Sequence, residues 1–343
     1  MQPWFQIGVN GVDVTGSFSK RAVTITLTDQ AGVENDKLTF TVDDRPPHLI
    51  VPARGSKVSL SIGYAFQPNA EHKYNGVRQF VGIFEIDEVR FSKPPSTLQI
   101  SAHANNTGNT FKSQKDRSWD DKTIKEIAEK IAGEHGLQPV IEGNLGAVKL
   151  EHVDQPQQSD MDFLTRLARR HGGIMKVAEG KLVIAKEGMS ASIGGQPMVT
   201  QIVSETEVSN YDALLQARSD YDGSTARWHD WELAKETEET EGELSKTKRS
   251  FAKVRTKDEA KAHSKADKEK LDKETETLTF TAVGNPRLMA ETLISLVGFR
   301  PGMRTGWRIK TATHKLDNSG YTTTCQCELP EAGDKNASTT GRA

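Results

Sequence analysis

The stretch SDMDFLTRLARRHGGIMKVAEGKLVIAKEG, residues 159–188, decides the fold class because its hydrophobic period changes halfway along. Ser159, with Asp162 three residues later, resembles the capping box that begins a helix. The apolar positions that follow lie on one face of that helix, at Phe163, Leu164, Leu167 and Ala168. Two short apolar runs then flank a turn at Glu179 and Gly180. The stretch therefore predicts a helix with a β-hairpin packed on it.

A second helical pattern stands upstream, in SWDDKTIKEIAEKIAGEHG, residues 118–136. Its apolar positions also keep to one side, at Ile124, Ile127, Ala128 and Ile131. Asp120 or Asp121 can cap the exposed N–H groups at the start of this helix. Together, the two helices and the hairpin predict a compact α/β module over residues 111–187.

The first part of the chain, residues 1–110, alternates apolar and polar side chains. The clearest runs are VTITL (23–27), LTFTV (38–42) and VSLSI (58–62). A period of two with β-branched and aromatic residues is typical of half-buried strands. Glycines and prolines separate the runs, so this part predicts a small antiparallel barrel or sandwich.

Strand-type sequence returns in residues 188–330, around Leu278 and Phe280 and again from Tyr321 to Leu329. The last residues, 331–343, are polar, and we expect them to be disordered.

A strongly charged segment, residues 232–257, is acidic in its first half and basic in its second. One interpretation is two solvated strands, or a hairpin whose opposite charges face each other. The other is a flexible loop that becomes ordered against a partner. A capping box at Thr256 and Glu259 follows and predicts a helix over residues 257–272. Its apolar stripe is thin, so this helix needs a neighbour.

Composition limits the classes of function. The 45 basic and 47 acidic residues give a net charge of −2, which argues against holding nucleic acid by its phosphates as the main activity. No stretch approaches the roughly 20 apolar residues of a membrane span, and we expect no membrane insertion. The N-terminus lacks the pattern of a secretory signal, so we expect synthesis in a reducing cytoplasm.

His229 and Asp230, in the segment WHDWE, are the nearest approach to a catalytic constellation. Adjacent strand residues point to opposite faces, which disfavours a working pair. The alternative is a structural turn in which Trp228 and Trp231 pack.

The remaining candidates have structural explanations. Cys325 and Cys327 can form half of a metal site, but buried reduced thiols explain them better. His171 is expected to interact with the dipole of the helix that it ends, and the acids Asp43 and Asp44 are expected in a turn. We therefore predict no catalytic, cofactor-binding or metal-binding residue, and no enzyme.

Residues 159–188 also resemble a stretch of contractile-tail hub proteins, with an acidic-aromatic start, F-L-x-R-L-A, a glycine pair and a hairpin ending in K-L-V. The matching residues are Asp162, Phe163, Leu164, Arg166, Leu167, Ala168, Gly172, Gly173, Lys181, Leu182 and Val183. Three other stretches agree: YDGSTARWHDWE from Tyr221, GNPRL from Gly284 and PGMRTGWRIKTATHKLDNSGYTTTCQCEL from Pro301. On these residues the chain resembles the phage late control gene D protein family, the baseplate hub of contractile tails. It is more distantly similar to the hub part of VgrG.

The resemblance implies a β-rich α+β fold with two related antiparallel β-barrel domains, residues 1–110 and 188–330, and the α/β module between them. It also implies a homotrimeric ring that adapts the sixfold tail tube to the threefold central spike and leaves a channel for DNA in transit. The implied partners are the spike, the tube or tube-initiator proteins and other baseplate proteins. The implied location is the virion baseplate, after synthesis in the host cytoplasm.

Two other functions compete with the structural hub. One is a cell-wall-degrading enzyme of the tail tip, a peptidoglycan hydrolase or peptidase. The other is a module that binds carbohydrate or cell wall.

Overall fold

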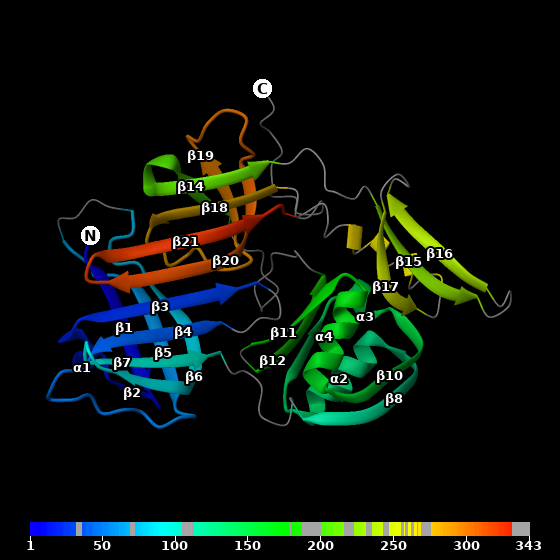
Figure 1. Cartoon of the computed structure of the whole chain (residues 1–343), viewed down its shortest axis with the longest axis horizontal. Helices are drawn as coiled ribbons and strands as arrows, with labels where there is room; N and C mark the ends of the chain where they lie inside the picture. Colours follow the sequence, from blue (N-terminus) through cyan, green and yellow to red (C-terminus); the bar gives the residue numbers. More distant parts are fainter. Residues whose placement is uncertain are drawn as a thin grey trace.

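The computed structural model describes residues 1–31, 36–68, 73–104, 111, 113–178, 180–186, 200–215, 223–230, 235–242, 247–254, 257, 260, 261, 264, 265, 267, 268 and 276–330. Figure 1 shows a strand-rich body on the left, an α/β unit at the lower right and a small sheet at the upper right. None of the described helices is long and apolar enough to cross a membrane. The predicted tail, 331–343, lies outside the described residues.

Period-two sequence builds the first half of the strand-rich body. Its elements are β1 (Pro3–Val9), β2 (Val12–Asp13), α1 (Thr15–Ser19), β3 (Val23–Gln30), β4 (Lys37–Asp43), β5 (Lys57–Tyr64), β6 (Arg78–Ser92) and β7 (Thr97–His103). In β3 and β4 every second side chain is buried, as the alternation predicts.

The second half of the body comes from the end of the chain. Its elements are β13 (Gln201–Ser204), the 3-10 turn η2 (Glu205–Glu207), β14 (Val208–Leu215), β18 (Glu276–Val283), β19 (Leu293–Val297), β20 (Gly306–Asp317) and β21 (Gly320–Glu328). The two halves share one thirteen-stranded sheet.

The two halves have the same strand order. In the first half, neighbouring strands run β3-β4-β7-β6-β5-β1, and in the second they run β14-β18-β21-β20-β19-β13. Numbered along the chain, with the two-residue β2 left out, both orders read second, third, sixth, fifth, fourth, first. One pair differs in direction, because β1 and β5 are antiparallel whereas β13 and β19 are parallel.

The tetrapeptide LTFT stands at the same place in both halves, at residues 38–41 of β4 and 278–281 of β18. In each copy, the leucine and the phenylalanine face a core and the threonines face away from it. Each tetrapeptide is paired with the sixth strand of its own half, β7 or β21.

A shared irregularity in strand pairing allows the two halves to be aligned residue by residue. The register of β6 on β7 shifts between Ile86 and Glu88, and that of β20 on β21 shifts between Ile309 and Thr311. The backbone N–H groups of Ile86 and Ile309 each donate, at 3.0 Å, to the residue that precedes the neighbouring strand, β5 or β19. Both halves therefore contain the same one-residue β-bulge at the same place.

The halves are joined through β20. Its first residues pair with β19, and residues 311–316 pair with β3 of the other half. One edge of β20 therefore pairs with β19 near its start and with β3 further along, so the sheet forks there. A strand of twelve residues is long enough for both partners. The fold is β-rich, as predicted, but the described strands of the strand-rich body form one forked sheet, and no closed barrel is found among them.

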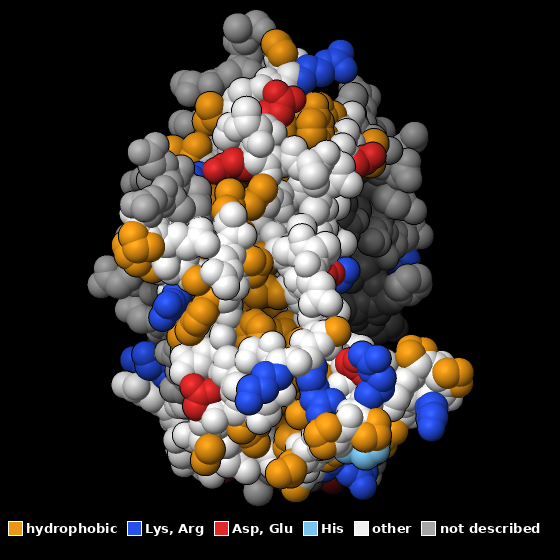
Figure 2. Space-filling view, turned by 90° about the vertical axis from the view of Figure 1, so that its left-hand side faces the viewer, with side chains coloured by type: hydrophobic (Ala, Val, Ile, Leu, Met, Phe, Trp, Pro, Cys, Tyr) orange, Lys and Arg blue, Asp and Glu red, His pale blue; other side chains and the backbone are white. Residues whose placement is uncertain are grey.

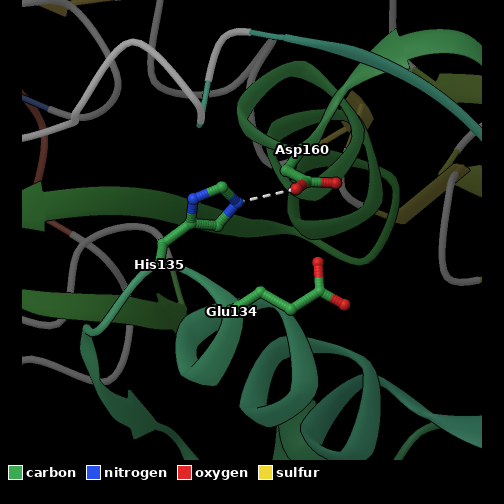
Figure 3. Close-up of side chains that lie close together, drawn as sticks. All are labelled: Glu134, His135 and Asp160. Atoms are coloured by element: carbon green, nitrogen blue, oxygen red, sulfur yellow. Dashed lines mark hydrogen bonds and ion pairs between the residues drawn. The ribbon is translucent and has the colours of Figure 1, made fainter.

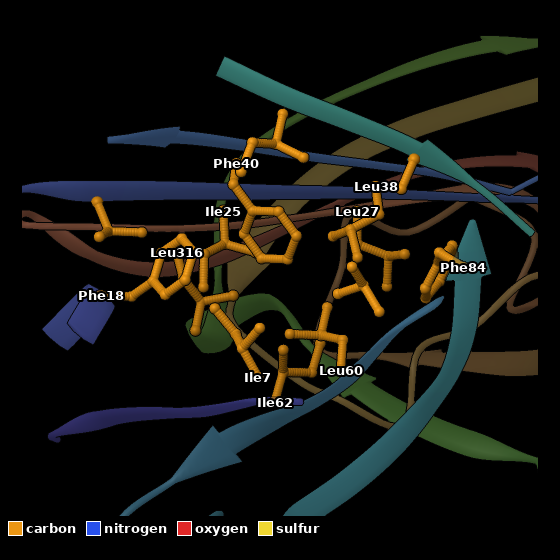
Figure 4. Close-up of a cluster of buried hydrophobic side chains, with 14 of the residues drawn as sticks. Ile7, Phe18, Ile25, Leu27, Leu38, Phe40, Leu60, Ile62, Phe84 and Leu316 are labelled. Carbon is orange, nitrogen blue, oxygen red and sulfur yellow. The ribbon is translucent and has the colours of Figure 1, made fainter. Parts of the chain in front are cut away.

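Each half of the sheet has its own hydrophobic core. The first contains side chains from β1, α1 and β3 to β7, together with Leu316 and Tyr321 from the β20–β21 hairpin (Figure 4). The second is built around Phe280, Trp307 and Ile309. Leu316 and Tyr321 lie on β20 and β21, whose other buried apolar side chains belong to the second core. Both residues are buried in the first core, so the β20–β21 hairpin links the two cores.

The α/β unit confirms both predicted helices and the predicted hairpin. Its elements are β8 (Gln114–Thr123), α2 (Ile124–Glu134), β9 (Gln138–Ile141), α3 (Gly143–Gly146), β10 (Lys149–Ser159), α4 (Asp160–Arg170), β11 (Gly173–Ala178) and β12 (Lys181–Lys186). The helices α2 and α4 contribute to one core with the β8–β10 pair and the β11-β12-β9 sheet.

The predicted caps of α2 at Asp120 or Asp121 are wrong. Both residues lie in β8, which stays paired with β10 as far as Thr123. The helix is capped by Thr123, whose Oγ1 accepts from the backbone N–H of Glu126 at 3.2 Å while the Glu126 carboxylate accepts from the Thr123 N–H at 2.8 Å.

The charged segment contributes strands to a small separate sheet. These are β16 (Lys235–Gly242) and β17 (Thr247–Val254), with β15 (Gly223–Asp230) between them. The acidic and basic strands therefore do not face each other as a hairpin. The acidic strand instead faces β15, where Arg227 Nε lies 3.0 Å from Glu238 Oε1.

The described positions of the expected helix 257–272 are helical. Among them, Ala260 is buried beside Ala226 and Trp228 of β15. Ala260, one residue of the thin apolar stripe, thus has its neighbours in this sheet.

Candidate functional site

The side chain of Asp160, at the start of α4, is fully buried and lies at the centre of an ionic cluster. Figure 3 shows its position beside His135 and Glu134. Its carboxylate accepts hydrogen bonds from Lys115 Nζ at 2.6 Å and from Arg117 Nη2 at 2.7 Å. His135 Nε2 lies 2.8 Å from the same group, and Gln155 Nε2 donates to it at 2.9 Å. Four polar partners therefore compensate the loss of hydration of the buried carboxylate.

Glu134, the last residue of α2, is the second acid of the cluster. Lys115 Nζ lies 3.1 Å from its carboxylate, and Arg117 Nη1 lies 2.8 Å from it. The same two cations thus bridge Glu134 and Asp160. The cluster joins β8 to both α2 and α4.

The cations decide the protonation state of both acids. Burial by itself raises the pKa of Asp160 and of Glu134, because it penalises the charged form. Hydrogen bonds from His135 and Lys115 to Asp160, and from Lys115 and Arg117 to Glu134, outweigh burial and hold both pKa values below their usual range. Both carboxylates are therefore ionised at neutral pH.

Glu134, His135 and Asp160 have the donor set of a metal site, with ligand atoms within 4.8 Å of one another. The carboxylates already receive an ammonium and a guanidinium group at hydrogen-bonding distance. A metal ion would have to displace both cations, so the geometry favours a structural ionic cluster. Sequence reasoning missed this cluster because its members are separated by up to 45 residues.

The candidate pair His229 and Asp230 lies in a strand, not in the expected turn. Both residues belong to β15, where they pair with residues of β16. Their side chains, and all of Trp231, lie outside the described residues, so the working pair stays untested.

The two cysteines of β21 are buried free thiols, as predicted. Both side chains point into the second core, and burial raises the pKa of each thiol. High pKa values keep Cys325 and Cys327 protonated and chemically inert.

Local structure accounts for the other candidates. His171 follows the last residue of α4 as its C-cap, and its interaction with the helix dipole stays a prediction. The carboxylate of Asp43 accepts from the backbone N–H of Arg45 at 3.1 Å, and that of Asp44 accepts from Leu49 N–H at 2.9 Å. The two acids thus shape the turn after β4, as predicted.

The strands from β14 to β6 form a run of eight, in the order β14-β18-β21-β20-β3-β4-β7-β6. The face of this run that points away from the cores is rich in hydroxyl groups, at Thr24, Thr26, Thr28, Thr39, Thr41, Thr279, Thr281, Thr311, Thr313, Thr322 and Thr324. We name it the threonine face.

Some of the exposed apolar side chains lie on the two end strands of this run. They are Tyr211, Leu214 and Leu215 on β14, Phe91 on the half of β6 that pairs with β7, and Phe80 and Ile83 on the half that pairs with β5. Exposed apolar groups along sheet edges mark sites of association with another chain.

Comparison with known proteins agrees with the expected family. The model of the phage tail baseplate hub (GPD) family matches residues 52–320. The probable baseplate hub protein of Escherichia phage 186 is 27% identical, with 96% of this chain and 93% of that protein covered. The protein of the same name from Escherichia phage P2 is 26% identical, with 96% and 94% covered. The tail protein of Neisseria meningitidis MC58 shares the fold, with a TM-score of 0.71, 15% identity, and 97% and 98% of the two chains covered. The chain therefore belongs to the phage tail baseplate hub family.

Proposed function

We propose that this hub protein forms a homotrimeric ring that adapts the sixfold tail tube to the threefold central spike. The observation that carries the proposal is the common strand order of the two halves, with the LTFT tetrapeptide and the bulge repeated in place. Three copies of such a chain present six similar half-sheets, which match a sixfold partner, while the whole ring keeps threefold symmetry. On this proposal each half is one unit of a related pair.

The threonine face supports a central channel for DNA. Its hydroxyl groups interact with water and carry no charge. The cations on the same face, Lys37, Lys315 and Arg90, are accompanied by the acids Glu88 and Asp212, so the face would not retain phosphates as a row of lysines would. The balanced composition, with a net charge of −2, agrees with a conduit. We therefore assign the threonine face to the lumen and the two cores to the wall.

The ends of the strands supply a surface for neighbouring tail proteins. Figure 2 shows the left-hand side of Figure 1, where hydrophobic side chains run in a broken line down the middle and Lys and Arg side chains gather towards the lower end. Arginine and large apolar side chains are enriched in protein interfaces. The proposed partners are the spike, tube or tube-initiator proteins and other baseplate proteins, in a virion whose parts are made in the host cytoplasm.

The experiment is a mass measurement. Size exclusion with light scattering on the purified chain, over a range of concentrations and after co-expression with the spike protein of the same virus, should give three times 37.8 kDa for the hub itself. Averaged electron micrographs of that species should show an open centre with three- or pseudo-sixfold symmetry. A chain that remains monomeric under every one of these conditions contradicts the proposal.

A further inference from the structure

The contact between β3 and β20 joins the two halves within one chain and has a defined register. His314 lies opposite Leu27, and Ala312 lies opposite Asp29, in an antiparallel pair. All four side chains are buried at this junction. The junction of β3 with β20 is therefore a paired and buried contact between the two halves of the body.

Each strand of this junction has a counterpart in the opposite half. Counted from LTFT, β14 corresponds to β3, and Ala213 takes the place of Leu27, because Ala213 pairs with Leu278 as Leu27 pairs with Leu38. Leu215 in the same way takes the place of Asp29.

The other partner, β20, corresponds to β6. Counted from the bulge, Val89 and Phe91 take the places of Ala312 and His314. The two counterpart strands, β14 and β6, stand at opposite ends of the run of eight.

The counterpart edges have no second strand beside them. Within the described residues, β14 has β18 as its strand partner, and β6 from Glu88 onward is paired with β7 alone. Phe91 is 64% exposed where its counterpart His314 is fully buried, and Leu215 is 47% exposed where Asp29 is 7% exposed. The same positions are thus covered at the internal junction and uncovered at the two ends.

We propose that β14 of one copy pairs with the second half of β6 of the next copy, in the register that β3 and β20 show within the chain. Leu215 then lies opposite Val89, Leu214 opposite Arg90 and Ala213 opposite Phe91. This interface rests on the proposed trimer and specifies how its copies are joined. It is a head-to-tail contact between two different edges, and three repeats close it into a ring.

The chemistry of the two edges matches in this register. Val89 and Phe91 meet Leu215 and Ala213 on the core side, so apolar groups cover apolar groups. On the threonine face, Arg90 becomes the diagonal neighbour of Asp212, an opposite charge within reach of its long side chain. In the single chain, Arg90 Nη2 lies 2.8 Å from Glu88 Oε1, in an exposed pair that is easily exchanged.

Disulfide trapping tests the register directly. The variant carrying Phe91→Cys and Ala213→Cys places one thiol on each edge, and opposite residues of an antiparallel pair have Cα atoms about 4.5–5.5 Å apart. Mild oxidation of the full chain should then give covalent dimers and a closed covalent trimer on a non-reducing gel. Each single variant should stay uncrosslinked, because the contact joins unlike edges. The native Cys325 and Cys327 are buried and give no background.

A matched control and a second measurement keep the outcomes separate. The pair Phe91→Cys with Leu214→Cys is one residue out of register and should crosslink at least tenfold less. Hydrogen exchange should slow at β14 and at the second half of β6 when the wild-type chain assembles. A trimer by mass without the crosslink or the slowed exchange overturns this interface and leaves the proposed function standing. A chain that never trimerises overturns both.

Discussion

Phe40 and Phe280 occupy matching places in the two halves of the chain. Each is the phenylalanine of an LTFT tetrapeptide, each is 1% exposed, and each pairs with the sixth strand of its own half. One strand order has thus been used twice, and each use keeps a large aromatic ring at the centre of its core.

Replacing either ring should destabilise the chain strongly. We expect Phe40→Ala and Phe280→Ala each to lower the free energy of unfolding by about 3–5 kcal/mol, because each leaves a cavity that its neighbours cannot fill. Urea unfolding followed by circular dichroism measures the change. Phe66→Ala is the control, because that ring is 66% exposed and its loss should cost less than about 0.5 kcal/mol.

The ionic cluster predicts a second effect on stability. Asp160→Asn removes the charge that Lys115 and Arg117 neutralise and leaves two cations with one acid, at a cost of about 3–5 kcal/mol. Glu129→Gln is the matched control, since Glu129 makes an exposed pair with Lys125 on the same helix as Glu134. Equal unfolding free energies for the two variants would contradict the assignment.

The same cluster predicts that a chelator has no effect on stability. Since Lys115 and Arg117 occupy the carboxylates of Glu134 and Asp160, EDTA should leave the Tm unchanged, and added Zn²⁺ should not raise it. Thermal scans with and without each reagent measure this. A rise of the Tm with Zn²⁺ that Asp160→Asn abolishes would show a metal site instead.

His314 should make stability fall in mild acid. Burial lowers its pKa to about 4, so the imidazole is neutral in the folded chain, whereas the unfolded chain takes up a proton below pH 6.5. The unfolding free energy should therefore drop between pH 6.5 and pH 4, by roughly 3 kcal/mol in all at 1.36 kcal/mol for each pKa unit. Unfolding curves at several pH values test this.

The control for that prediction is His314→Gln. Glutamine can keep a hydrogen bond with the Tyr321 hydroxyl, which lies 2.8 Å from His314 Nδ1, but it does not titrate. This variant should lose the part of the pH dependence between pH 6.5 and pH 4. An unchanged slope would mean that other groups cause it.

Local patterns made much of this fold predictable. The period-two runs gave β3, β4 and β5 of the first half, and the helical faces gave α2 and α4, because in each case burial on one side follows directly from spacing. The cap of α2 was misplaced because β8 continues to Thr123, and the pairing with β10 that sustains it involves residues far along the chain. Similarly, no local signal reveals that β15 separates the acidic and basic strands.

The candidate interface was hidden for the same reason. LTFT is visible twice in the sequence, but its meaning depends on which strands lie beside it. The strand order shows that the covered edge of β3 and the uncovered edge of β14 are equivalent. Exposure of Leu215 then becomes informative, because it departs from the burial of its counterpart Asp29.

Opposite charges placed on the two residues that face each other in the proposed interface distinguish a direct contact from a general effect of surface charge. Leu215→Lys alone and Val89→Glu alone should each weaken the trimer at least tenfold, since each puts a charge against an apolar residue of the next copy. The double variant should recover most of the loss, because the lysine and the glutamate then lie opposite each other. Analytical ultracentrifugation over a concentration series measures the association. Ile50→Lys, at a residue that is 96% exposed and distant in sequence from both edges, should leave it unchanged. If the double variant assembles no better than the two single ones, Leu215 and Val89 do not face each other, even if the chain still forms a trimer.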